Sequence, residues 1–100
     1  MILEIVTWTI KPNMEPRFEA AFEQAQTFLE NAKGYKSHQF SRCIEETNKY
    51  TLLVNWGTLE DHTDGFRQSE QYLEYRALIS EYYEPGAILK HYEAIYENAL

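Results

Sequence analysis

The chain has 100 residues, enough for one domain over residues 1–100 with a thin hydrophobic core. Its 16 acidic residues outnumber the 9 basic ones, and the formal charge of −7 repels nucleic-acid backbones and anionic membranes. One cysteine excludes an internal disulfide, no apolar run reaches the ~20 residues that span a bilayer, and no leader precedes the first strand, so we expect a cytoplasmic protein.

The first predicted element is a β-strand over residues 2–10. It is rich in β-branched and aromatic side chains, and apolar residues fall on both of its faces, which is typical of a central strand. Pro12 and Asn13 end this strand. Apolar residues then recur at helical spacing between Phe18 and Leu29, which predicts a helix.

A β-hairpin is expected after this helix. Its two strands are predicted over residues 35–44 and 49–56, and a polar loop at 45–48 joins them. Apolar residues at every second position give the later strand one fully apolar face. That face consists of Tyr50, Leu52, Val54 and Trp56.

Two helical segments are expected after Trp56. Thr58 and Asp61 have the spacing of a capping box, with Asp in place of the usual Glu or Gln. Gly65 marks where the first segment breaks. Ser69 is placed to start the second helix.

A last strand is expected over residues 87–96. The order strand-helix-strand-strand-helix-strand is that of the ferredoxin-like βαββαβ motif, an α+β fold with a four-stranded antiparallel sheet and two helices on one face. Strands with large apolar side chains on both faces would leave an apolar patch on the uncovered face of a monomer. The sequence therefore predicts an oligomer.

His62 is the first candidate catalytic residue. It follows Trp56 by about one turn, and a neutral imidazole near a helix N-terminus accepts a proton from a bound phenol or enol. A surface histidine on an acidic turn is an equally simple interpretation. His91 is placed to bind a ligand from the last strand, although a hydrogen bond to Glu93 or to a partner subunit explains it more simply. His38 is expected to be solvated.

Arg76 is the second candidate catalytic residue. If the second helix keeps its period, this guanidinium shares a face with aromatic side chains, where it would hold a substrate oxygen or stack on the substrate ring. Arg67 lies at the helix break. A salt bridge to Glu70, Glu74 or a partner carboxylate is the alternative for both arginines. On the first interpretation, Arg76→Ala weakens ligand binding more than Arg67→Ala.

The predicted substrate-binding residues are aromatic or carry one polar group: Trp56, Phe66, Tyr72, Tyr75 and His91. An indole on a pocket wall would stack a flat aromatic molecule and donate one N–H to a developing oxyanion, although Trp56 also suits an ordinary core position. The histidines lack metal-ligand spacing, and the chain has no phosphate loop, nucleophile elbow or dinucleotide motif. We therefore expect no metal and no cofactor.

Four sequence features, taken together, point to a known family. They are the opening strand followed by Lys11-Pro12 and a helix, the strand that closes on Trp56, the Phe66-Arg67-Gln68-Ser69 break, and the last strand around Lys90-His91-Tyr92. Over residues 2–96 this pattern resembles the antibiotic biosynthesis monooxygenase family of small dimeric α+β-barrel proteins.

The resemblance implies a homodimer whose two sheets pack face to face to close a barrel, with one pocket per subunit between helices and sheet. It also implies monooxygenation without a cofactor, in which an electron-rich dihydroxyarene or enol loses a proton and its anion passes an electron directly to dioxygen. The protein then has to bind, deprotonate and shield a small aromatic or quinol-like substrate. Many family members carry a histidine near the Phe66 position, so a role for His62, one turn earlier, is an analogy.

Three other functions fit the same fold. One is a non-catalytic small-molecule binder or sensor, and another is a structural dimerisation module without an enclosed cavity. The third is haem binding, because haem-degrading relatives combine an asparagine on the first strand with a tryptophan and a histidine around the second helix. This chain has no asparagine before Asn13, and the other two positions fall near Phe66 and Arg76, which disfavours haem cleavage.

Overall fold

Four strands and two main helices follow one another in the order βαββαβ along residues 1–98, the part of the chain that the computed structural model describes. The strands are β1 (Ile2–Thr9), β2 (Tyr35–Arg42), β3 (Lys49–Trp56) and β4 (Ile88–Glu93). The helical elements are α1 (Glu15–Glu30), η1 (Asp61–Gly65), η2 (Phe66–Gln68), α2 (Glu70–Ile79) and η3 (Ser80–Tyr82). This is the order predicted from the sequence, although β4 is shorter than the strand expected over residues 87–96.

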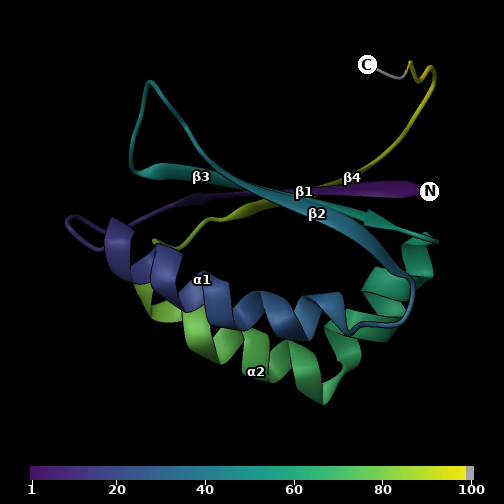
Figure 1. Cartoon of the computed structure of the whole chain (residues 1–100), viewed down its shortest axis with the longest axis horizontal. Coiled ribbons are helices and arrows are strands. Elements are labelled where there is room, and N and C mark those ends of the chain that lie inside the picture. The colour runs from purple at the N-terminus through teal and green to yellow at the C-terminus, as the bar shows by residue number, and fades with distance from the viewer. Residues whose placement is uncertain (99–100) are drawn as a thin grey trace.

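The strands form one antiparallel sheet in the order β2-β3-β1-β4, and both main helices lie on the same face of it (Figure 1). The predicted ferredoxin-like α+β fold is therefore confirmed. β1 lies between β3 and β4, as its two apolar faces indicated. The register places Glu4 of β1 beside Val54 of β3 and His91 of β4, so a carboxyl group sits in the interior of the sheet.

The turns after β3 begin where the sequence predicted. The Asp61 N–H donates to the Thr58 hydroxyl at 3.2 Å, and the Thr58 N–H donates to the Asp61 carboxylate at 3.0 Å, which completes the capping box. Ser69 caps α2, because its hydroxyl accepts a hydrogen bond from the Tyr72 N–H at 3.1 Å. Within residues 1–98, no helix combines the length and the apolar composition that crossing a membrane requires.

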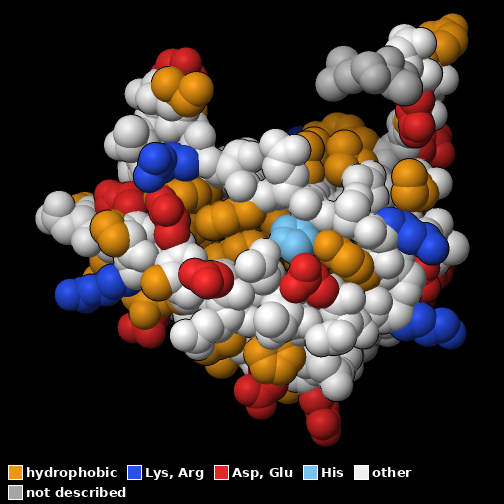
Figure 2. All heavy atoms as spheres, in the orientation of Figure 1, with side chains coloured by type: hydrophobic (Ala, Val, Ile, Leu, Met, Phe, Trp, Pro, Cys, Tyr) orange, Lys and Arg blue, Asp and Glu red, His pale blue; other side chains and the backbone are white. Residues whose placement is uncertain are grey.

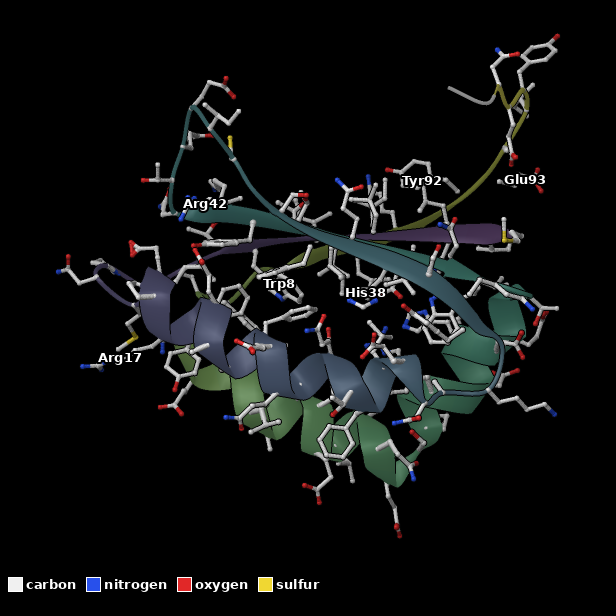
Figure 3. The ribbon with its side chains drawn as sticks, in the orientation of Figure 1. Trp8, Arg17, His38, Arg42, Tyr92 and Glu93 are labelled. Atoms are coloured by element: carbon white, nitrogen blue, oxygen red, sulfur yellow. The ribbon has the colours of Figure 1, made fainter. Side chains whose placement is uncertain are left out.

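Aromatic rings fill the space between α1 and the sheet. Phe22 of α1 stacks on Phe40 of β2 with centroids 4.0 Å apart, and Phe40 stacks in turn on Tyr50 at 5.4 Å. Trp8 of β1, which Figure 3 shows between the sheet and the helices, meets Phe18 edge to face at 5.4 Å. Figure 2 shows hydrophobic side chains along this gap. This half of the helix-sheet layer is a closely packed core.

The opposite face of the sheet is uncovered in the described part of the chain (Figure 1). Tyr92 points away from the helices (Figure 3) and is 48% exposed, and Ile88, four residues earlier on β4, is 57% exposed. Leu3 and Ile5 of β1 line a hollow on this face together with Tyr92. We call this the open face. An apolar sheet face in water is the feature from which the sequence predicted an oligomer.

Candidate functional site

A cavity of about 350 Å³ lies between α2 and the sheet. From the sheet side its wall is formed by Glu4, Val6, Trp8, Leu52 and Leu89. From the helical side it is formed by Leu29, His62, Phe66, Arg67, Tyr72, Tyr75, Arg76, Ile79 and Tyr83, and the segment 85–87 completes it. Apolar and aromatic walls with a few polar groups are typical of sites for small organic ligands.

A buried carboxyl group and two imidazoles form a connected cluster at this cavity. The indole N–H of Trp56 donates to Oε1 of Glu4 at 2.9 Å, and Nε2 of His62 lies 3.5 Å from the same oxygen. Nδ1 of His62 is hydrogen-bonded to Nε2 of His91 at 2.7 Å. Glu4 and His62 are only 5% and 2% exposed. We call these four residues the Glu4 cluster.

Local structure brings the Glu4 cluster together. Glu4 and His91 are paired across β1 and β4, so their side chains share the helix-facing side of the sheet. The capping box at Thr58 starts η1 directly after β3, and η1 is a π-helical turn in which the N–H of Phe66 reaches the carbonyl of Asp61. In this turn His62 stacks on the indole of Trp56, with ring centroids 5.3 Å apart.

Burial shifts the protonation equilibria of the cluster. Removal from water raises the pKa of Glu4 to about 7, although the Trp56 hydrogen bond and the positive charge of Arg67 act in the opposite direction. Burial lowers the pKa of His62 to about 4, and the neighbouring His91 and Arg67 lower it further. Burial and Arg67 also lower the pKa of His91. Near neutral pH, both imidazoles are therefore uncharged and the Glu4 carboxyl is near the middle of its titration.

Five of the residues proposed from the sequence line the cavity: His62, Phe66, Tyr72, Tyr75 and Arg76. Trp56 does not line it, because its indole is fully buried beneath Glu4 and His62. His91 does not line it either. The hydrogen bond expected from His91 to Glu93 is replaced by one to His62, because the sheet register points His91 toward η1.

Two expectations about the other polar side chains were wrong. His38 is half-buried rather than solvated, and its ring nitrogens lie 2.5 Å from the Tyr35 hydroxyl and 2.9 Å from Oε1 of Gln26. Arg67 lies on the cavity wall like Arg76, and its guanidinium carbon is 6.0 Å from the centre of the Tyr72 ring. The prediction that Arg76→Ala weakens ligand binding more than Arg67→Ala therefore loses its basis. In the described part of the chain neither arginine forms an ion pair.

Sequence reasoning missed Glu4. A signal was present, because a single carboxylate interrupts the otherwise apolar face formed by Ile2, Val6 and Trp8 on the first strand. A charged residue at such a position is rarely buried unless it is paired. Across residues 1–98, no three or more His, Cys, Asp and Glu side chains are grouped so that they could hold a metal ion.

The model of the antibiotic biosynthesis monooxygenase family matches residues 1–78. The uncharacterised protein YczJ of Bacillus subtilis (strain 168) is 45% identical over 95 residues, which cover 95% of this chain and 100% of YczJ. A crystal structure from Bordetella bronchiseptica with the same family description is 33% identical, with a TM-score of 0.90 over 95% of this chain and 97% of that chain.

A further structural relative is SnoaB, a cofactor-independent oxygenase from Streptomyces nogalater. It superimposes with a TM-score of 0.84 over 96% of this chain and 94% of that chain. Its sequence is only 14% identical, so this similarity concerns the fold.

Proposed function

Because the chain belongs to the antibiotic biosynthesis monooxygenase family, we propose that it is a cofactor-independent monooxygenase acting on a small aromatic or quinol-like compound. The observation that carries this proposal is the cavity beside α2, which combines aromatic walls with the buried pair Glu4 and His62. Its volume of about 350 Å³ is at the low end of the ~300–1,000 Å³ of ligand sites. A substrate of one or a few rings suits this space.

The reaction requires an electron-rich substrate that ionises inside the cavity. Loss of one proton leaves an anion that passes an electron to dioxygen; one oxygen atom is then incorporated and the other leaves as water. Balanced for a CH₂ group that becomes a carbonyl, the equation is RCH₂R′ + O₂ → RC(O)R′ + H₂O. The enzyme has to hold the substrate, accept and return a proton, and keep bulk water away.

The cavity residues can divide these tasks. Phe66, Tyr72 and Tyr75 supply flat surfaces against which an aromatic ring packs. Arg76 and Arg67, which are exposed and on the cavity wall, would stabilise the negative charge of the ionised substrate. Trp56 and His91 would act through Glu4 and His62 rather than by touching the substrate.

We also propose that two copies of the chain associate through the open face to form a homodimer. Exposed apolar residues on this face, such as Ile88 and Tyr92, would then be removed from water. Sedimentation or light scattering should give twice the mass of one chain. Tyr92→Glu should shift the equilibrium toward monomers, whereas Leu73→Glu, at an exposed position on the outer side of α2, should leave the mass unchanged. A wild-type protein that stays monomeric at micromolar concentration contradicts this proposal.

Oxygen uptake with a panel of hydroquinones and anthrones tests the proposed activity. The expected result is uptake above the uncatalysed rate for at least one compound, with formation of the corresponding quinone or ketone. Ala87→Trp, at the cavity wall, should abolish it by filling the site, and Ala77→Trp, exposed on α2 outside the cavity, is the matched control. Binding without uptake across the panel would favour a non-catalytic binder or sensor.

The other two alternatives make separate predictions. A structural dimerisation module should have side chains filling the space between helices and sheet, whereas about 350 Å³ of that space is open beside α2. A haem protein should shift the Soret band when haemin is titrated into it. We expect no such shift.

A further inference from the structure

Glu4 is a buried carboxyl group with one oxygen committed to the protein and the other facing the cavity. Oε1 accepts the Trp56 hydrogen bond and is the atom nearest His62. Among the side-chain hydrogen bonds of residues 1–98, none involves Oε2, and no buried polar side-chain atom in this part of the chain lacks a partner. Oε2 is therefore accessible from the cavity, whose wall includes Glu4.

His62 is less well placed to take a proton from a substrate. Both of its ring nitrogens are directed at protein groups, Nδ1 at His91 and Nε2 at Glu4. Its ring also stacks on Trp56, which fixes the plane of the imidazole. The imidazole therefore connects Glu4 to His91 instead of presenting a free nitrogen to the cavity.

We propose that Glu4 is the catalytic base, and that His62 and His91 carry protons between Glu4 and solvent at the edge of the sheet. This inference rests on the proposed function, since it assigns the proton acceptor for the same cavity. The path has two steps, 3.5 Å from Glu4 Oε1 to His62 Nε2 and 2.7 Å from His62 Nδ1 to His91 Nε2. His91 is half-buried on β4, which is an edge strand, so the path ends near water.

Each transfer in this path conserves protons and charge. The substrate C–H or O–H proton moves to Oε2 of Glu4, and the bonding electron pair stays on the substrate as the anion. The carboxyl group of Glu4 then rotates so that the protonated oxygen faces His62, and its proton moves to Nε2 of His62. The Nδ1 proton of His62 moves to Nε2 of His91, and the Nδ1 proton of His91 leaves to water. The transfers end with both imidazoles neutral and in their other tautomers.

The overall reaction restores the starting tautomers. Monooxygenation with dioxygen places both hydrogens of the substrate CH₂ group on the released water, so the exported proton is needed again when water forms. A proton that returns from His91 through His62 to Glu4 reverses each transfer in turn. One turnover therefore leaves the path ready for the next.

The charged and titratable groups around Glu4 come from every element that faces it. They are His62 of η1, Arg67 of η2, Tyr75 of α2 and His91 of β4, while Trp56 of β3 supplies the hydrogen bond. Burial raises the pKa of Glu4 to about 7 against the opposing effects of Trp56 and Arg67. A base with this pKa accepts and releases protons readily near neutral pH.

Glu4→Gln is the primary test, because it keeps the shape and an acceptor for the Trp56 N–H but removes the base. We expect kcat to fall by roughly 100-fold or more, with the affinity for a non-ionising substrate analogue unchanged. The dependence of kcat/KM on pH near 7 should also disappear. Wild-type kcat and an unchanged pH profile in Glu4→Gln would overturn the assignment while leaving the monooxygenase proposal intact.

His91→Ala tests the path to solvent. We expect a fall in kcat of about 100-fold, the low end for loss of a proton-transfer group, and recovery when imidazole is added to the buffer. His38→Ala is the matched control, since His38 is also half-buried and hydrogen-bonded but lies outside the Glu4 cluster. A fall that imidazole does not reverse, or an equal fall in His38→Ala, would overturn the role of His91.

A titration without substrate separates failure of this inference from failure of the proposed function. Carbon-13 NMR of the glutamate carboxyl groups should show Glu4 titrating near 7, and His91→Ala should move that midpoint. If the wild-type protein consumes no oxygen, the monooxygenase proposal fails, and this titration still decides whether Glu4 is coupled to the imidazoles. An ordinary glutamate midpoint for Glu4 would overturn the inference even in an active enzyme.

Discussion

The two halves of the helix-sheet layer contrast with each other. Under α1, four side chains are buried against the sheet: Phe18, Phe22, Ala25 and Leu29. Under α2, only Tyr75 and Ile79 are buried, and a cavity of about 350 Å³ remains. Both helices cover the same sheet, so the difference comes from the residues that each helix presents to it.

The contrast extends to polarity. The filled half contains stacked and edge-to-face aromatic rings, such as Phe22 on Phe40. The hollow half contains the only two residues classed as buried and polar within residues 1–98, Glu4 and His62. Burial of a carboxyl group costs free energy that close packing would not require. The molecule thus uses one half of its layer for stability and leaves the other half available for binding and proton transfer.

The largest effect is expected from removing a core side chain under α1. Phe22→Ala removes a ring that stacks on Phe40 at 4.0 Å and meets Trp8 edge to face, and it should lower the free energy of unfolding by about 3–5 kcal/mol. Phe66→Ala, beside the cavity, should cost about half as much, because fewer atoms surround that ring on the cavity side. Urea unfolding of both variants measures the difference, and equal losses would show that the two halves are equally well packed.

The next effect concerns the ionisation of Glu4. Its pKa is raised from 4.5 to about 7 in the folded protein, so between these pH values the folded state holds a proton that the unfolded chain has released. Stability due to this group therefore falls as pH rises from 4.5 to 7, by at most about 3 kcal/mol. Glu4→Gln cannot ionise at this position, so the variant should be more stable than the wild type above pH 7, but not near pH 4.

His62 contributes with the opposite sign. Its pKa is lowered from 6.5 to about 4, so its stabilising effect is complete above 6.5 and is lost as pH falls toward 4. The wild type and Glu4→Gln both contain His62, so the difference in their stability reports the ionisation of Glu4 alone. Urea unfolding at several pH values is the measurement. A stability difference that does not change with pH would mean that Glu4 titrates normally in the folded protein.

A smaller effect is expected at the start of α2. Ser69→Ala removes the acceptor for the Tyr72 N–H and should cost about 1 kcal/mol of unfolding free energy. Because α2 forms one wall of the cavity, the same substitution should also weaken ligand binding. Ser80→Ala, at the other end of α2 and without a side-chain cap, is the control. Equal stability of the two variants would show that the cap contributes little.

The smallest effect is expected at the cavity arginines. Arg67→Ala and Arg76→Ala should each weaken binding of an ionised aromatic ligand by about 1 kcal/mol, because both side chains are exposed to solvent. Calorimetry measures the affinity of each variant for a phenolate and for its neutral methyl ether. The phenolate reports both the charge and the packing of the arginine, and the ether reports its packing alone. If either variant loses equal affinity for both ligands, that arginine contributes by packing rather than by its charge.

Much of this contrast was visible in the sequence. The phenylalanines at helical spacing predicted α1, and the capping residues Thr58 and Ser69 predicted the segments after β3. Local signals of this kind depend on hydrogen bonds within one turn and on the period of apolar residues. The predictions of His62 and Arg76 as cavity residues also followed from helix position.

The arrangement of polar groups at the cavity could not be predicted in the same way. His91 was expected to bind a ligand or to form a hydrogen bond with Glu93 or a partner subunit, but it is hydrogen-bonded to His62, 29 residues away. Arg67 was placed at the break between the two helical segments, outside the aromatic face, whereas η2 carries it to within 6.0 Å of the centre of the Tyr72 ring. Glu4 was overlooked, although it interrupts an apolar strand face.

The sequence by itself determined the order of elements, the apolar faces and the helix caps, because these depend on residues that are close along the chain. Tertiary structure alone decided that Glu4, His62 and His91 form one connected group at a cavity. They come from β1, η1 and β4, and strand register together with a π-helical turn brings them within hydrogen-bonding range. Burial then raises the pKa of Glu4 to about 7 and lowers that of His62 to about 4, which is a property of the assembled site and of no single residue.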